Sequence, residues 1–190
     1  MAAALSGKSD EAIAYANKAI GLDPLSVVNL FIATAATGGD NERTLEIAEQ
    51  LIDLAPNFYA GYWMAGINYI KLERFEEGIN AYQTAISFGD EPSALATAGM
   101  TYGFMGDKTK AMEILEITKN IECIELYGNC FIGDVYLGLG DLDTAFMYYD
   151  KSIANKEGFM LWKPAIFRSV PGLMEDPRAI QMIKKMNVIY

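Results

Sequence analysis

The chain has 190 residues, of which 52% are hydrophobic and 21% charged, and its formal net charge is −10. This composition supplies enough apolar side chains for a folded core and argues against a disordered chain. The acidic balance argues against binding to nucleic-acid phosphates or to an anionic membrane, because both need a surface rich in Lys and Arg.

The first expected element is a helix in residues 7–24, with a small residue at Ala12 and a proline at its end, Pro24. It has the pattern of the second helix of a hairpin that recurs downstream, but only "MAAALS" precedes it. A lone second helix leaves its apolar face uncovered. We therefore expect this chain to be the C-terminal module of a longer polypeptide, with Met1 not the native start. The alternative is a natural short protein whose first helix is vestigial.

Four complete helical hairpins are expected next, at residues 27–56, 57–91, 92–125 and 126–157. The last three align in columns that are 33 or 34 residues apart. Small side chains in such columns let the two helices of a hairpin approach closely. One small column contains Gly66, Gly99 and Gly133, a second contains Gly78, Ala111 and Ala145, and a tyrosine column contains Tyr69, Tyr102 and Tyr136.

Gly-Asp pairs separate the two helices of three hairpins. A glycine there can end the first helix in the left-handed conformation, and the aspartate can cap the second helix. The pairs are Gly39-Asp40, Gly106-Asp107 and Gly140-Asp141.

Residues 158–190 depart from the repeat and are expected to cap the last hairpin. We expect a loop with Trp162 and Pro164, followed by a strand-like stretch that contains a phenylalanine. Asp176 and Pro177 supply a helix cap and a first-turn proline. The closing helix is expected to have an apolar stripe and a basic end that suits its dipole. The stripe is Ile180, Ile183 and Met186, and the basic residues are Lys184 and Lys185.

The columns resemble the tetratricopeptide repeat, a 34-residue helix–turn–helix unit with the pattern W-x2-L-G-x2-Y, then A-x3-F, then P. The resemblance covers residues 7 to about 154. It is carried by Tyr62-x2-Ala65-Gly66-x2-Tyr69 and by Leu95-x2-Ala98-Gly99-x2-Tyr102. It implies an all-α fold, a right-handed α-solenoid of about four and a half hairpins over residues 1–157, with a C-terminal capping helix.

The tail is also similar to the ends of tetratricopeptide tails on bacterial multidomain signalling proteins and transcription regulators. The residues that carry this similarity are Trp162, Pro164, "DPR" and "KKMNV". In those proteins the tails follow DNA-binding, nucleotidyl cyclase or kinase domains, and this chain contains no feature of any of them.

We expect no enzyme, metal or cofactor. The sequence has no histidine, which removes His-based acid–base catalysis and nearly all zinc and non-haem iron sites. The stretch "GLGDLD" at residues 138–143 lacks the third glycine of a nucleotide fingerprint and follows a helix rather than a strand. Cys123 and Cys130 are seven residues apart on a helix, too far to form a disulfide, and are expected to be small buried residues in a reducing cytoplasm.

The family resemblance implies a concave face lined by the first helix of each unit. Some members bind chaperone C-termini there through Lys, Asn and Arg, but that basic clamp is missing from the matching columns. We therefore expect an apolar groove with aromatic anchors for a helix or an extended apolar segment. An alternative places Ile67, Met100 and Leu137 in the core between repeats. The expected groove residues are Phe31, Trp63, Ile67, Ile70, Lys71, Met100, Phe104, Asp134 and Leu137, and the same columns contain Ala96, Gly103, Cys130 and Gly138.

The expected function is a protein-interaction module, a scaffold or sensor, in a larger cytoplasmic bacterial regulator. Its partner would be a protein or peptide, including an upstream domain of the same polypeptide, with no direct nucleic-acid or membrane binding. Two alternatives stay open. One is a homo-oligomerisation module, such as a homodimer, and the other is a free-standing chaperone-like adaptor. The sequence names neither the partner nor the upstream domain.

Overall fold

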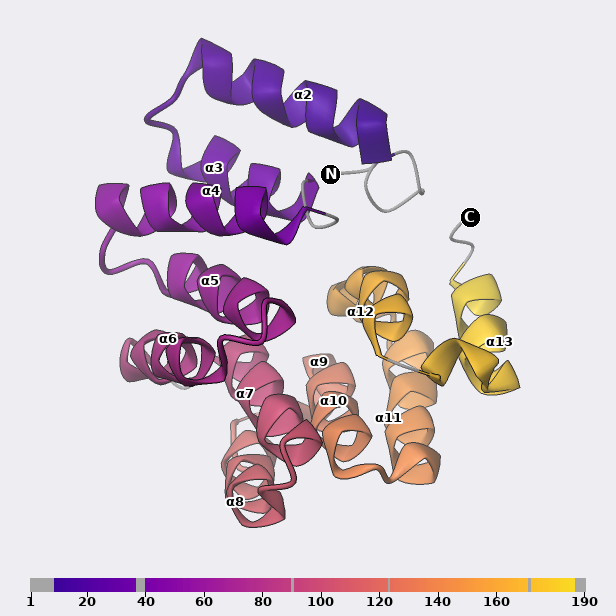
Figure 1. The fold of residues 1–190 in the computed structure, drawn as a ribbon. Coiled ribbons are helices and arrows are strands. Elements are labelled where there is room, and N and C mark those ends of the chain that lie inside the picture. Colours follow the sequence, from indigo (N-terminus) through magenta and orange to yellow (C-terminus); the bar gives the residue numbers. More distant parts are fainter. Residues whose placement is uncertain (1–8, 37–39, 90, 123, 171, 187–190) are drawn as a thin grey trace. The chain divides into compact units, whose positions relative to one another are not determined.

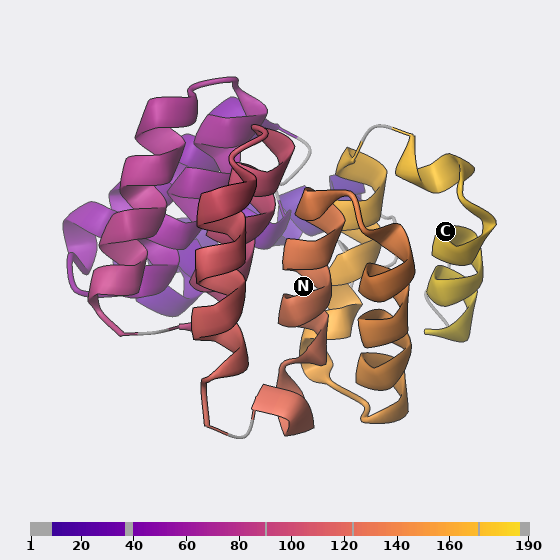
Figure 2. The same ribbon diagram turned by 90° about the horizontal axis from the view of Figure 1, so that it is seen from below.

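A computed structural model describes residues 9–36, 40–89, 91–122, 124–170 and 172–186. In these residues every regular element is helical, so the expected all-α fold is confirmed. The chain divides into two compact units, Met1–Ala94 and Leu95–Tyr190, which are described separately (Figures 1 and 2). The first unit contains α2 (Ser9–Leu22), α3 (Val27–Ala36), α4 (Asn41–Leu54), α5 (Tyr59–Lys71) and α6 (Phe75–Ser87).

The division falls near the start of α7 (Pro92–Phe104), and the second unit continues with the remaining elements. In it, α10 packs against α11, as in the antiparallel pair that Figure 2 shows. In the first unit, α3 packs on α4 and α5 on α6, while α2 packs on α3. The elements that follow α7 are α8 (Lys108–Lys119), α9 (Ile124–Tyr127), α10 (Asn129–Leu139), α11 (Leu142–Ala154), η1 (Gly158–Trp162), α12 (Lys163–Ser169), η2 (Leu173–Glu175) and α13 (Pro177–Lys185).

The Gly-Asp turns adopt the expected conformation. Gly106 and Gly140 have φ angles of 84° and 80°, in the left-handed region that a residue with a Cβ seldom adopts. Asp40, Asp107 and Asp141 each accept a hydrogen bond from the backbone N–H three residues further on, which caps α4, α8 and α11. Gly39 lies outside the described residues. Local sequence therefore determines where these helices begin.

The turn between α5 and α6 is built differently. Glu73 takes the left-handed conformation there with a φ of 61°, and the N-cap residue Arg74 makes no side-chain cap. This turn lacks the Gly-Asp pair, and its strain is borne by a residue with a Cβ.

The small columns leave room for large side chains of the paired helix. A Cβ on Gly66 would lie 2.5 Å from the Cε1 atom of Tyr82, and one on Gly133 would lie 2.7 Å from the Cε1 atom of Tyr149. Both tyrosines are almost completely buried. The columns thus mark close contacts between α5 and α6 and between α10 and α11.

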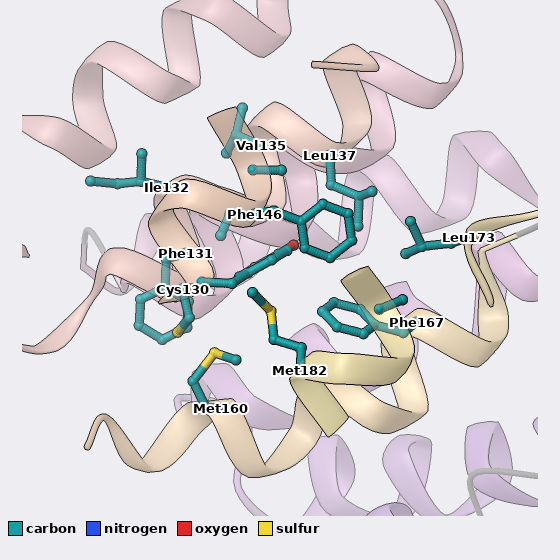
Figure 3. Packing of buried hydrophobic residues seen from close by; sticks show 14 of the residues in the cluster. Cys130, Phe131, Ile132, Val135, Leu137, Phe146, Met160, Phe167, Leu173 and Met182 are labelled. Carbon is teal, nitrogen blue, oxygen red and sulfur yellow. The ribbon is translucent and has the colours of Figure 1, made fainter. Parts of the chain in front are cut away.

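The tail continues the core of the second unit. Phe167 from α12, Leu173 from η2 and Met182 from α13 belong to the same buried cluster as Val135 and Phe146 from α10 and α11 (Figure 3). This packing joins η1, α12 and α13 to the last hairpin, rather than leaving them as a separate surface helix.

Three expectations for the tail are wrong. Residues 163–169 form the helix α12 instead of a strand-like stretch, and Trp162 ends a 3-10 helix instead of lying in a loop. Pro164 permits this because a proline in the first turn of a helix loses no hydrogen bond. The stripe of α13 is also shifted, since Ala179, Met182 and Ile183 are buried while Ile180 is exposed. The cap is as expected, because Asp176 accepts a hydrogen bond from the backbone N–H of Arg178.

Candidate partner-binding surface

The first unit brings three of the expected groove residues together. Phe31 on α3 and Trp63 and Ile67 on α5 are all partly buried. They pack on one cluster, and the ring of Phe31 also meets the edge of the Phe58 ring, with centroids 6.0 Å apart. The result is an apolar surface with two aromatic residues on the first helices of two consecutive hairpins. The cluster beneath it contains Leu45, Ala48, Met64 and Ala65.

The next two expected groove residues, at the end of α5, behave differently. A Cβ on Gly78 would lie 2.6 Å from the Cδ1 atom of Ile70, so the tip of Ile70 lies against α6 in the space that this glycine leaves. Lys71 is exposed, and desolvation by its surroundings lowers the pKa of its ammonium group. Ile70 therefore contributes mainly to its own hairpin, and Lys71 is the one positive charge among the expected residues of this unit.

In the second unit, two of the expected groove residues are accessible to solvent and two are covered by other parts of the chain. Phe104 is 51% exposed and Met100 is partly buried, whereas Asp134 and Leu137 are buried, with 4% and 2% exposure. Leu137 belongs to the core cluster that includes the tail residues Phe167 and Leu173. Asp134 and Leu137 are therefore not accessible to a partner in this structure, because the tail covers that face of α10.

A buried ion pair holds the tail on α10. The Nζ atom of Lys163 lies 2.5 Å from the Oδ2 atom of Asp134, and the hydroxyl of Tyr149 donates a hydrogen bond of 2.8 Å to Oδ1. Burial opposes the charged form of Lys163, but the neighbouring negative groups, Asp134 above all, outweigh it and raise the pKa of this lysine. Burial, with the charge of Asp134, raises the pKa of Tyr149. Lys163 thus stays charged and paired inside the protein.

A second buried carboxylate caps α10. Gly128, the N-cap residue, has no side chain to offer, and Glu157 takes over its function from a position that is distant in the sequence. Its carboxylate accepts hydrogen bonds from the backbone N–H groups of Asn129 and Cys130 at 3.2 Å each, and from the hydroxyl of Ser152 at 2.6 Å. Sequence reasoning missed Glu157 and Lys163. In the sequence, each of the two appears only as a charged residue beside an apolar run. This pattern does not indicate which buried residue it contacts.

Cys130 lies in this interior and is chemically protected. Its side chain is fully buried, and this burial raises the pKa of its thiol to about 12. We expect a Cys123→Ser variant, which isolates Cys130, not to react with Ellman's reagent at about pH 8, where an ordinary thiol is partly ionised. The same variant should react completely in guanidinium chloride. Rapid labelling of the folded protein would contradict the observed burial. Cys123 lies outside the described residues.

The described residues can also be compared with the requirements of a metal site and of a membrane-spanning helix. They contain no group of three or more acidic, Cys or His side chains placed to hold a metal ion. Within the same part of the chain, no helix combines the length and apolar character needed to cross a bilayer.

Comparisons with known proteins agree with the helical hairpins. A family model described as "Tetratricopeptide repeat" matches residues 1–24, 59–88, 92–116 and 123–158. The hairpin α3–α4 lies between the first two matched segments. A search of the curated proteins found no match.

Several solved structures share the fold. A crystal structure of MamA is 25% identical over 79% of this chain and 90% of that one, with a TM-score of 0.55. TTC0263, a thermophilic TPR protein of Thermus thermophilus, is 21% identical over 78% of this chain and 84% of its own, with a TM-score of 0.64. YrrB, described as a TPR protein with an unusual peptide-binding site, is 16% identical over 90% of this chain and 89% of its own, with a TM-score of 0.50.

Proposed function

Because the chain belongs to the tetratricopeptide repeat family, we propose that it is a protein-interaction module that binds an apolar segment of a partner on α3 and α5. The observation that carries this proposal is the gathering of Phe31, Trp63 and Ile67 on the first helices of two consecutive hairpins. Proteins of this family mediate protein–protein interactions, and solenoid repeats use the surface formed by corresponding helices for binding.

The chemistry of this surface selects the kind of partner. Two partly exposed aromatic residues and an isoleucine offer mainly apolar contact area, which suits an apolar side chain. No Lys, Asn and Arg clamp occupies the matching positions, so the surface does not suit a terminal carboxylate. We propose an amphipathic helix or an extended segment with one or two large apolar anchors as the ligand.

The similarity of the tail to those of bacterial regulators supports a more specific proposal. In it, the chain is the sensor or scaffold part of a cytoplasmic regulator, and its ligand is a partner protein or another domain of the same polypeptide. The observation that supports it is the tail motif of Trp162, Pro164, "DPR" and "KKMNV".

The test uses peptides selected by phage display on the immobilised chain, whose affinities are then measured by fluorescence anisotropy. Trp63→Ala is expected to weaken binding at least about tenfold, because a buried aromatic anchor typically contributes about 2 kcal/mol or more. The matched control is Met147→Ala on α11, an exposed apolar residue on a second helix, which should change affinity by less than about twofold.

Circular dichroism must show that both variants remain folded. Equal affinities of Trp63→Ala and the parent chain would reject the α3–α5 surface. If no peptide binds and light scattering shows a mass that grows with concentration, the homo-oligomerisation alternative is favoured. Leu22, Leu25 and Val28 would then be the residues to test, because they are 78%, 72% and 64% exposed near one turn of the first unit.

A further inference from the structure

The negative charge of the protein is concentrated in its first unit. Residues 1–94 contain 13 Asp or Glu and 5 Lys or Arg, whereas residues 95–190 contain 12 and 10. The first unit also contains a hollow of about 460 Å³ between α4 and the turn that joins α5 to α6, and its lining does not include Phe31, Trp63 or Ile67. Its lining consists of Glu42, Leu45, Glu46, Glu49, Leu72 and Arg74.

The glutamates form a ladder along one wall of this hollow. Glu42, Glu46 and Glu49 follow each other at intervals of about one helical turn, so they share a face of α4 and span about 10 Å along its axis. All three are exposed. Charges at this spacing match cationic side chains that are themselves one turn apart on a second helix.

The opposite wall is held in place by its own contacts. The guanidinium of Arg74 lies 4.5 Å from the centre of the Tyr69 ring and donates hydrogen bonds of 2.6 and 2.9 Å to Glu77. The hydroxyl of Tyr69 donates a hydrogen bond of 3.0 Å to Glu49. Burial, and then the carboxylate of Glu49, raise the pKa of Tyr69. Arg74 is thus engaged by Glu77, while Glu46 in the ladder pairs with Arg43 and Glu49 accepts the hydrogen bond of Tyr69.

The floor of the hollow is apolar. Leu45 is only 6% exposed, and Leu72 is partly buried on the same cluster that supports Trp63. A partner that placed one apolar side chain between its cationic residues would cover this floor while pairing with the ladder. Arg43 and Glu46 form an ion pair of 2.8 Å, and both of their side chains are exposed. Such a pair contributes little and can be exchanged for a new one.

We propose that the hollow between α4 and the α5–α6 turn is a docking surface for a basic amphipathic helix of a protein partner. Its occupant carries Lys or Arg one turn apart, with an apolar residue between them. The complementary charge supports this choice, since nucleic acids and anionic lipids would be repelled by the ladder. This surface is lined by other residues than the apolar one on α3 and α5, and both rest on the same cluster. The proposal goes beyond the function inferred above.

The probe is a capped helical peptide of about 15 residues, with Lys at one-turn spacing and a central Leu. Its affinity for the full chain is measured by fluorescence anisotropy at low salt. The double variant Glu46→Gln, Glu49→Gln is expected to bind this peptide at least about tenfold more weakly than the parent chain. Added salt should also weaken binding of the peptide to the parent chain. A peptide with Gln in place of Lys, or Ser in place of the central Leu, should bind more weakly.

The matched control is Glu113→Gln with Glu116→Gln on α8. It removes two negative charges from exposed positions, as the first double variant does. It also removes one exposed ion pair at a spacing of three residues, Glu116–Lys119, which matches the loss of the Arg43–Glu46 pair. This control should bind the Lys peptide within about twofold of the parent chain.

Equal losses in the two double variants would overturn the proposal, because they would show a general attraction to an acidic protein. A parent chain that binds the Lys and Gln peptides equally would also overturn it. Trp63→Ala should leave binding of the Lys peptide unchanged. A loss in that variant that the Glu46→Gln, Glu49→Gln variant does not share would place the peptide on the α3–α5 surface and reject the hollow, while leaving the function proposed above intact.

Discussion

Replacing Gly138 by alanine is expected to lower the free energy of unfolding by about 3 kcal/mol. A Cβ at this position on α10 would lie 2.3 Å from the carbonyl oxygen and 2.5 Å from the Cα atom of Met100 on α7. The contact is reciprocal, since a Cβ on Gly103 would lie 2.4 Å from the carbonyl carbon of Gly138. Backbone atoms of the two helices touch here, and no flexible side chain can move aside to make room.

The measurement is chemical denaturation followed by circular dichroism. Its control is Gly21→Ala, because Gly21 lies in α2 and nothing lies within 4 Å of its added Cβ. In the absence of a clash, alanine stabilises a helix relative to glycine by about 0.5–1 kcal/mol. We therefore expect the two substitutions to shift the unfolding midpoint in opposite directions. A Gly138→Ala protein as stable as the parent would disprove the close α7–α10 contact.

Replacing Lys163 by methionine is expected to cost about 3–5 kcal/mol, because it leaves the carboxylate of Asp134 buried without its cation. The side chains of Lys163 and Asp134 are 3% and 5% exposed, so water cannot replace the lost partner. Adding Asp134→Asn to Lys163→Met should restore part of the stability, since it removes the unpaired charge.

The control comes from the same tail. Lys185 also pairs with an aspartate, Asp150, at 2.6 Å, but both side chains are about half exposed. Lys185→Met should cost less than about 1 kcal/mol, which is the usual limit for an exposed pair. The free energies of unfolding of the two single variants and of the double variant are measured by chemical denaturation. Equal losses for Lys163→Met and Lys185→Met would contradict the burial of the Lys163 pair.

The same two contacts explain why only part of the expected groove is open. Gly103 and Gly138 fall in columns that the family resemblance assigns to the groove, but each lies against the backbone of the neighbouring first helix. Asp134 and Leu137 fall in such columns as well, and the tail covers them. Of the alternatives, Leu137 joins the core of the second unit and Met100 lies partly buried at its edge. Ile67 lies partly buried at the edge of a cluster in the first unit.

The sequence by itself determined the local features of this protein. Helix limits follow from signals a few residues long, such as the aspartates at 40, 107, 141 and 176 that cap the helices after them. The glycine columns at Gly66 and Gly133 mark contacts within one hairpin, where a short turn leaves the second helix few other places to pack. The family pattern rests on these same local contacts.

Only the tertiary structure decided which surfaces stay exposed. Periodicity assigns a residue to one face of its helix, but burial depends on the segment that covers that face, and this segment can lie far away in the chain. Lys163 reaches Asp134 across 29 positions, and Glu157 reaches Asn129 across 28. Buried charges are tolerated only where a partner of opposite charge or a set of donors is brought to them. No short stretch of sequence contains both members of such a pair.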